Sequence, residues 1–319
     1  MSRFMLTKEH RRFTEFANAV RKQKTIGICY GPAGVGKTQS GERYAGWHKA
    51  RDTIEYWGDD THHCRAAGAA PINAALARSR TVFFTPQVQT TPKQLKLELD
   101  DVFILVSLCI EEHLIAQRAA QTTDKPVVYR VRKPVVELMI IDESERLSAG
   151  CIEHLRDRFD RYGIALLLIG MTGLEKQFSH YAQFYSRVGF AHQYRALADD
   201  ELLFVLQRHW KRFGKTLDPD DFTDHQAVTA IDRITRGNFR LLDRLFTQID
   251  RVLRINDLDT ITEDVIEAAR STLVIGTPES QRATQIWSQQ AQTVTHSWHR
   301  HRRVTYLPVR WPIPKRTPA

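Results

Sequence analysis

The sequence predicts an α/β protein in which a parallel five-stranded sheet, flanked by helices, is followed by a small α-helical lid. Three observations predict this fold. A glycine-rich segment at residues 31–38 joins an apolar run to a helical stretch, a second apolar run ends in two acids at 142–143, and the pattern becomes purely helical from residue 199 onward. Near-continuous apolar runs are typical of strands buried on both faces of a parallel sheet.

The glycine-rich segment matches the pattern G-x-x-x-x-G-K-[ST], which forms a phosphate-binding loop. Its members are Gly31, Pro32, Ala33, Gly34, Val35, Gly36, Lys37 and Thr38. Glycines let main-chain N–H groups turn inward around phosphates, and the helix that follows adds its positive N-terminus. A chance match is the alternative, but the strand-like run before the loop and the helix after it disfavour chance. We therefore expect ATP as cofactor, with Lys37 on the β- and γ-phosphates and Thr38 on Mg²⁺.

The run at residues 135–143 ends in Asp142 and Glu143. The carboxyl ends of parallel strands form the edge where open α/β folds bind ligands. Asp142 is expected to hold Mg²⁺ through water, and Glu143 to activate the attacking water. Acids also follow strands in ordinary turns, but an upstream phosphate loop favours the functional interpretation.

The remaining elements of the α/β part follow from periodicity and from proline and glycine positions. An amphipathic helix at about 7–24 leads into the first strand at 25–30. Residues 51–80 are alanine-rich and polar without a clear period, and we interpret them as an irregular insertion. Further strands are expected at 81–85, 164–170 and 189–194, and further helices at 39–50, 91–120 and near 152–159.

Thr172 lies just beyond the predicted strand at 164–170. A polar side chain at this edge can orient the attacking water or the γ-phosphate. A threonine that only caps the next helix would give the same sequence. Both interpretations stay open.

The predicted lid contains helices at 199–213, 223–235, 238–255 and 262–273. Gly214 ends the first, and Thr223 with Gln226 forms a capping box for the second. The organisation is thus an N-terminal helix (1–24), a nucleotide domain (25–197), a lid (198–276) and a tail (277–319).

The tail carries most of the net positive charge of the chain. The formal net charge is +9 with a pI near 9.5, and residues 277–319 contain seven Lys and Arg against one acid. We interpret this proline- and tryptophan-containing segment as a flexible tail that is available to a partner. The charge favours a polyanionic partner.

Other classes of protein are disfavoured. No apolar run approaches the roughly 20 residues that span a bilayer, and the N-terminus has no signal-peptide core. The four scattered cysteines suit a reducing cytoplasm. His62, His63 and Cys64 have no second ligand pair nearby, which favours a polar loop over a metal site.

Together, the phosphate loop, the acids after the strand, the polar residue after the next strand, a later arginine and the helical lid resemble the AAA+ ATPases over residues 5–275. Residues 235–245 look like the lid signature of the TnsC/TniB/MuB group, ATPases that prepare DNA targets for transposases. The resemblance implies that Arg240 senses the γ-phosphate and that Arg187 enters the site of a neighbouring subunit. Arg195 is a competitor for the second role, and surface salt bridges are the alternative for both. The family has a shorter connection where this chain has residues 51–80.

The resemblance implies an ATP-dependent regulator that binds duplex DNA without reading its sequence. It would form a homo-oligomeric ring or filament, connect a target-selection protein, which can be a CRISPR complex, to a transposase, and disassemble on hydrolysis. The tail is the candidate contact for transposase or target selector. Candidate DNA contacts are Lys93, Lys96, Lys125, Arg130, Arg132 and Lys133.

Two other functions are compatible with the same ATP residues. One is a helicase loader or replication-initiator-like ATPase, which would bind a replicative helicase. The other is a non-DNA regulator of the secretion-associated type, which would show no salt-dependent DNA binding.

Overall fold

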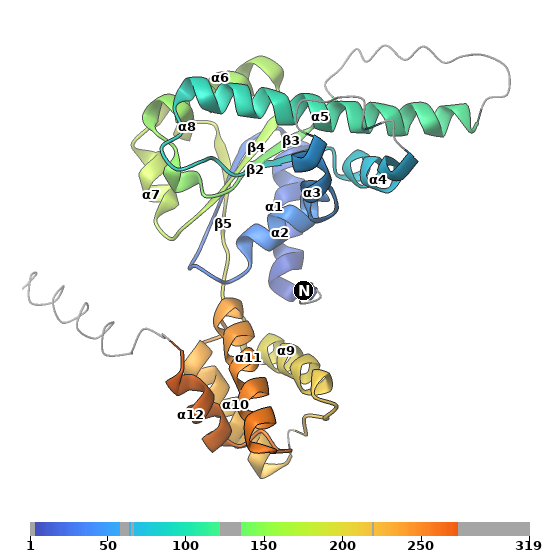
Figure 1. Cartoon of the computed structure of the whole chain (residues 1–319). Coiled ribbons are helices and arrows are strands. Elements are labelled where there is room, and N and C mark those ends of the chain that lie inside the picture. Colours follow the sequence, from blue (N-terminus) through green and yellow to red (C-terminus); the bar gives the residue numbers. More distant parts are fainter. Residues whose placement is uncertain (1–3, 58–63, 65–66, 122–134, 219, 274–319) are drawn as a thin grey trace, which may run out of the picture. The chain divides into compact units, whose positions relative to one another are not determined.

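The computed structural model describes residues 4–57, 64, 67–121, 135–218 and 220–273 (Figure 1). Contacts divide the chain into Met1–Thr272 and Leu273–Ala319, and the description concerns the first of these units. The predicted tail and four of the candidate DNA contacts, Lys125, Arg130, Arg132 and Lys133, lie outside the described residues.

The centre of the first unit is a five-stranded sheet with the order β2-β3-β4-β1-β5. All pairs are parallel, which confirms the predicted α/β class. The strands are β1 (Ile26–Tyr30), β2 (Thr81–Phe84), β3 (Leu138–Ile141), β4 (Ala165–Gly170) and β5 (Val188–Gln193). Because they run the same way, the segments that follow them gather at one edge. The phosphate loop, Asp142, Met171 and Tyr194 all lie there.

Helices cover both faces of the sheet. Figure 1 shows α1 (Lys8–Gln23) and α2 (Lys37–Ala45) on one side, and α6 (Ala149–Tyr162), α7 (Leu174–Ser179) and α8 (Ala182–Tyr185) on the other. The packing of α2 is close, since a Cβ on Gly41 would lie 2.9 Å from Ile169 and Phe83. The long α5 (Pro92–Ala119) follows β2 and begins at its N-cap, Thr91.

The segment at 51–80 is not irregular where the structure describes it, so that prediction was wrong. The helix α3 (Trp47–Trp57), a short 3₁₀ turn (Ala67–Ala69) and α4 (Ala70–Ser79) occupy most of it. Helix α4 contacts α2, α3 and α5, so it lacks the single apolar stripe that reveals a surface helix. Gly46, with φ of +73°, separates α2 from α3 where one helix was expected.

The lid is helical as predicted, with α9 (Asp199–Arg212), α10 (Phe222–Thr235), α11 (Phe239–Asn256) and α12 (Glu263–Ser271). Its core includes a stack of His209 on Phe246, with ring centroids 4.1 Å apart. The expected capping box at Thr223 is wrong. The N-cap is instead Asp221, two residues earlier, whose side chain accepts from the N–H of Asp224. Within the described residues, no helix is both long and apolar enough to cross a membrane.

Candidate functional site

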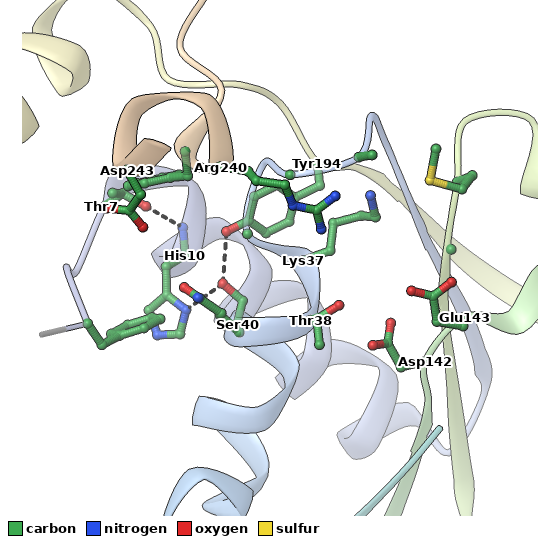
Figure 2. A pocket seen from close by; sticks show the side chains of 18 of the residues that line it. Thr7, His10, Lys37, Thr38, Ser40, Asp142, Glu143, Tyr194, Arg240 and Asp243 are labelled. Atoms are coloured by element: carbon green, nitrogen blue, oxygen red, sulfur yellow. Dashed lines mark hydrogen bonds between the residues drawn. The ribbon is translucent and has the colours of Figure 1, made fainter. Parts of the chain in front are cut away.

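A cavity of about 580 Å³ opens at the carboxyl edge of the sheet. Figure 2 shows side chains that line it, which come from the N-terminal segment, the phosphate loop, the end of β3 and the lid. The lining includes Phe4, Thr7, His10, Gly34, Gly36, Lys37, Thr38, Ser40, Asp142, Glu143, Glu145, Tyr194, Phe239, Arg240, Asp243 and Arg244. The structure therefore brings together the phosphate loop, both predicted acids and the predicted lid arginine.

The phosphate loop has the backbone that an anion cradle requires. Gly34 and Gly36 have φ angles of +79° and +106°, which glycine adopts without a steric penalty. Gly36 is the N-cap of α2 and supplies no side-chain acceptor, so the first N–H groups of the helix have no cap from that position. These features fit the phosphates of a nucleotide.

Lys37 is folded back onto the loop. Its Nζ donates to the carbonyl oxygens of Gly31 at 2.7 Å and Pro32 at 2.6 Å, and the residue is only 8% exposed. Burial lowers the pKa of Lys37, opposed by nearby acids such as Asp142. A phosphate group would compete with these two carbonyls for the ammonium.

The predicted Mg²⁺ ligands meet beside the loop. Thr38 and Asp142 both line the cavity (Figure 2), and the side chain of Asp142 is buried at the end of β3. Burial raises the pKa of Asp142, and the Thr38 hydroxyl partly offsets the effect. A hydroxyl and a carboxylate next to a phosphate cradle are oxygen donors of the kind that Mg²⁺ takes, so the residues fit the ion.

Two glutamates, rather than the one predicted, line the cavity. Glu143 adopts a left-handed conformation with φ of +49°, which costs a non-glycine residue about 1–2 kcal/mol. Its carboxylate lies 3.6 Å from Arg146. Glu145 also lines the cavity, and its Oε2 is buried without a hydrogen-bond partner among the described residues. Sequence reasoning missed Glu145, although an acid two residues after Glu143 was a visible signal.

Two predicted catalytic residues lie elsewhere. Thr172 is exposed and does not contribute to the described cavity lining, whereas its neighbour Met171 does. Arg187 is held by Asp160 through two hydrogen bonds of 2.6 and 2.8 Å and does not line the cavity. Arg195 is also outside the lining. The roles assigned to Thr172 and Arg187 stay predictions.

The lid touches the phosphate loop through the start of α11. Asn238 Nδ2 donates to the Ala33 carbonyl at 2.8 Å, and the Arg240 N–H donates to the Gly34 carbonyl at 3.1 Å. The Oδ1 of Asn238 simultaneously caps α11 by accepting from Leu241 N. A Cβ on Gly34 would lie 2.6 Å from Asn238 Oδ1. Gly34 is therefore needed both for its φ and for contact with the lid.

Replacing Asn238 with serine tests this contact. Serine keeps an N-cap oxygen but cannot reach the Ala33 carbonyl, so the lid loses one side-chain bond to the loop. Because one hydrogen bond is worth about 1 kcal/mol, we expect ATP affinity in a binding titration to fall about fivefold. The melting temperature without nucleotide should fall less than that of Asn238→Ala, which also loses the cap. An unchanged affinity for ATP would contradict a role for this contact.

The other end of the cavity contains rings and neutral hydrogen-bonding groups. Ser40 Oγ lies 3.0 Å from His10 Nδ1 and 2.8 Å from the Tyr194 hydroxyl. Phe4 packs edge-on against His10, with centroids 4.8 Å apart. Burial, followed by the charge of Arg43, lowers the pKa of His10, which favours its neutral form. Aromatic surface beside neutral donors and acceptors suits a nucleobase. Sequence reasoning did not predict this cluster.

Comparisons with known proteins agree with this site. An AAA domain model matches residues 20–178. The chain is 39% identical over 274 residues to a potential ATP-binding protein of Staphylococcus aureus, covering 86% of this chain and 97% of that protein.

Solved structures share the fold. One is RuvB, a Holliday junction branch migration motor of Thermotoga maritima, with a TM-score of 0.50 and 16% identity over 85% of this chain and 70% of that one. A single-substitution variant of RuvB matches with a TM-score of 0.51, at 16% identity over 86% and 71% of the two chains. At this identity the likeness concerns the fold alone. With a relative matched over nearly its whole length and a phosphate loop built as described, the chain belongs to the AAA-domain family of ATP-binding proteins.

Proposed function

We propose that this protein is an ATPase that assembles on duplex DNA and regulates transposition. The observation that carries the ATPase part is the convergence of Lys37, Thr38, Asp142 and Arg240 on one cavity. These residues come from the phosphate loop, the end of β3 and the lid. A bound nucleotide would therefore contact both the nucleotide domain and the lid.

Each residue has a definite role in this proposal. The loop N–H groups and Lys37 hold the β- and γ-phosphates, and Arg240 adds positive charge from the lid. Thr38 and Asp142 would hold Mg²⁺, which supplies charge neutralisation between phosphates. Glu143 takes the proton of the attacking water, and Glu145 is the competing base. Asp142 must be ionised to hold Mg²⁺. Because burial raises its pKa, we expect Mg²⁺ binding to weaken, as the pH falls, at a higher pH than it would with an ordinary aspartate.

Arg187 is proposed to act in the site of a neighbouring subunit. Arg187→Ala is expected to lose most ATPase activity. Without this arginine, no cation from a neighbouring subunit would stabilise the negative charge that develops on the γ-phosphate. Mixing it with Glu143→Gln should restore activity, because some sites then combine an intact Glu143 with an intact Arg187. Steady-state phosphate release measures both effects.

A matched control separates catalysis from the ion pair with Asp160. Asp160→Ala breaks the same salt bridge but leaves the guanidinium in place, so it should retain activity. If mixing fails to restore turnover, or Asp160→Ala is as inactive as Arg187→Ala, the role in the neighbouring site is wrong.

The DNA part of the proposal has three supports. The chain carries a formal charge of +9, residues 235–245 resemble the lid of the TnsC/TniB/MuB group, and the fold is that of a motor that works on Holliday junctions. Lys93 and Lys96 are exposed in the first turns of α5, where a phosphate backbone can reach them. The transposase and target selector remain proposed partners.

Electron microscopy of the full chain with a slowly hydrolysed ATP analogue tests assembly. Rings or filaments on duplex DNA that require nucleotide are the expected result. Monomers that do not bind DNA would overturn the DNA part of the proposal and favour the non-DNA regulator. Assemblies that bind a replicative helicase instead of a transposase would favour the loader.

A further inference from the structure

A second cavity of about 330 Å³ has no lining residue in common with the ATP cavity. Its lining residues come from the C-terminal ends of α1, α2 and α4 and from the start of α3. Helices α1 and α4 end just before β1 and β2, so the cavity faces the amino edge of the sheet, opposite the phosphate loop. Its lining includes Arg21, Arg43, Tyr44, His48, Lys49 and Arg78, and we call it the basic pocket.

The basic pocket has no acid in its described lining. Arg43, Lys49 and Arg78 form no ion pair with any described carboxylate. Arg21 donates to the Ser79 carbonyl at 2.8 Å and lies 3.8 Å from Glu137, which also pairs with Arg80 at 2.8 Å. Arg43 lies 2.8 Å from His48 Nε2. Burial, followed by the charges of Arg43 and Lys49, lowers the pKa of His48, which favours a neutral ring that accepts from Arg43.

Helix dipoles do not account for this charge. Arg21, Arg43 and Arg78 each lie in the last turn of their helix, where a cation offsets the negative end. Each such end carries about half a negative charge, while the start of α3 adds about half a positive one and has no acid in its first turn. The cations of the lining are Arg21, Arg43, Lys49 and Arg78. After the helix ends and Glu137 are taken into account, roughly two of their positive charges remain unbalanced. A basic cluster of this kind, which lines a surface cavity, is complementary to an anion.

We propose that the basic pocket binds a phosphate group. One guanidinium group can donate two parallel hydrogen bonds to the oxygens of a phosphate. The excess positive charge of the basic pocket matches the negative charge of a phosphate. The phosphate can come from a DNA backbone or from a small phosphate compound. Only the DNA source rests on the proposed function. Helix α2 has the phosphate loop at its start and the basic pocket at its end, so the two sites share one rigid element.

The test compares two double variants with equal changes of charge. Lys49→Glu/Arg78→Glu changes the pocket, and both residues are exposed and without acidic partners among the described residues, so folding should tolerate the change. Lys176→Glu/Lys211→Glu changes exposed lysines of α7 and α9 and is the control. All proteins are full chains saturated with a slowly hydrolysed ATP analogue and Mg²⁺, so that the phosphate loop is already filled.

The first arm measures binding of a fluorescent DNA duplex across a salt series. If the pocket holds backbone phosphates, the pocket variant should bind the duplex at least about tenfold more weakly. The plot of log K against log salt should also become less steep, by about two. The control should change less than the pocket variant in both quantities. This result would support the proposal with DNA as the source.

The second arm measures thermal stabilisation by inorganic pyrophosphate. Stabilisation of wild type and control, but not of the pocket variant, would support a small phosphate compound as the source. Wild-type protein that binds no DNA would overturn the proposed DNA function, and this second arm would still decide on the pocket. The phosphate site is overturned if the two double variants are indistinguishable in both arms.

Discussion

Lys37→Ala is expected to weaken ATP binding about a hundredfold and, with it, nucleotide-dependent assembly on DNA. Charge-assisted hydrogen bonds are worth about 1.5–3 kcal/mol each, and Lys37 would make more than one to the phosphates. Part of that gain is offset, because Nζ must first leave the Gly31 and Pro32 carbonyls. Titration of ATP against the full chain measures the change directly.

The controls for Lys37 address charge and folding separately. Lys37→Arg keeps the charge but replaces a compact ammonium by a planar fork in a buried position, so it should also bind poorly. Lys176→Ala removes an exposed lysine and should bind ATP normally. Because Lys37→Ala also loses two hydrogen bonds without nucleotide, stabilisation by ATP is compared within each variant. Equal affinity in wild type and Lys37→Ala would remove the loop as the phosphate site.

The sheet and the phosphate loop were predictable because their signals are local. Buried parallel strands are short apolar runs, and the loop needs glycines and a lysine at fixed spacing. Asp142 was predictable for a related reason, since a parallel strand delivers the residue that follows it to a known edge. Strand ends differ by up to a few residues; the run at 135–143, for example, forms strand only over Leu138–Ile141.

What escaped prediction depends on packing between distant segments. Helix α4 has neighbours on several sides and so shows no stripe. The contact of Asn238 with Ala33 joins residues far apart in the chain, and a cap residue gives no hint of a second partner. The same holds for His10, Ser40 and Tyr194, which meet only because α1, α2 and β5 converge. A role in a neighbouring subunit, as proposed for Arg187, leaves no trace within one chain.

Glu143→Gln is expected to bind ATP within about twofold of wild type but to hydrolyse it at least about a hundredfold more slowly, the usual range for loss of a general base. Glutamine has the same shape and backbone preferences as glutamate, so the left-handed conformation at this position should persist. Assemblies on DNA should then outlive those of wild type. Phosphate release in single turnovers, beside an ATP titration, separates chemistry from binding.

Glu145→Gln decides between the two carboxylates. Glu143 is partly exposed and paired with Arg146, whereas Glu145 has a buried oxygen without a partner and lies against the end of β4 at Gly170. If Glu143 is the base, Glu145→Gln should slow turnover only a few-fold, and Arg146→Ala, which breaks the Glu143 ion pair without removing the carboxylate, should stay active. Should Glu145→Gln be the inactive variant while Glu143→Gln turns over normally, the proton acceptor is Glu145. The strained backbone at Glu143 would then serve to place the turn that carries Glu145.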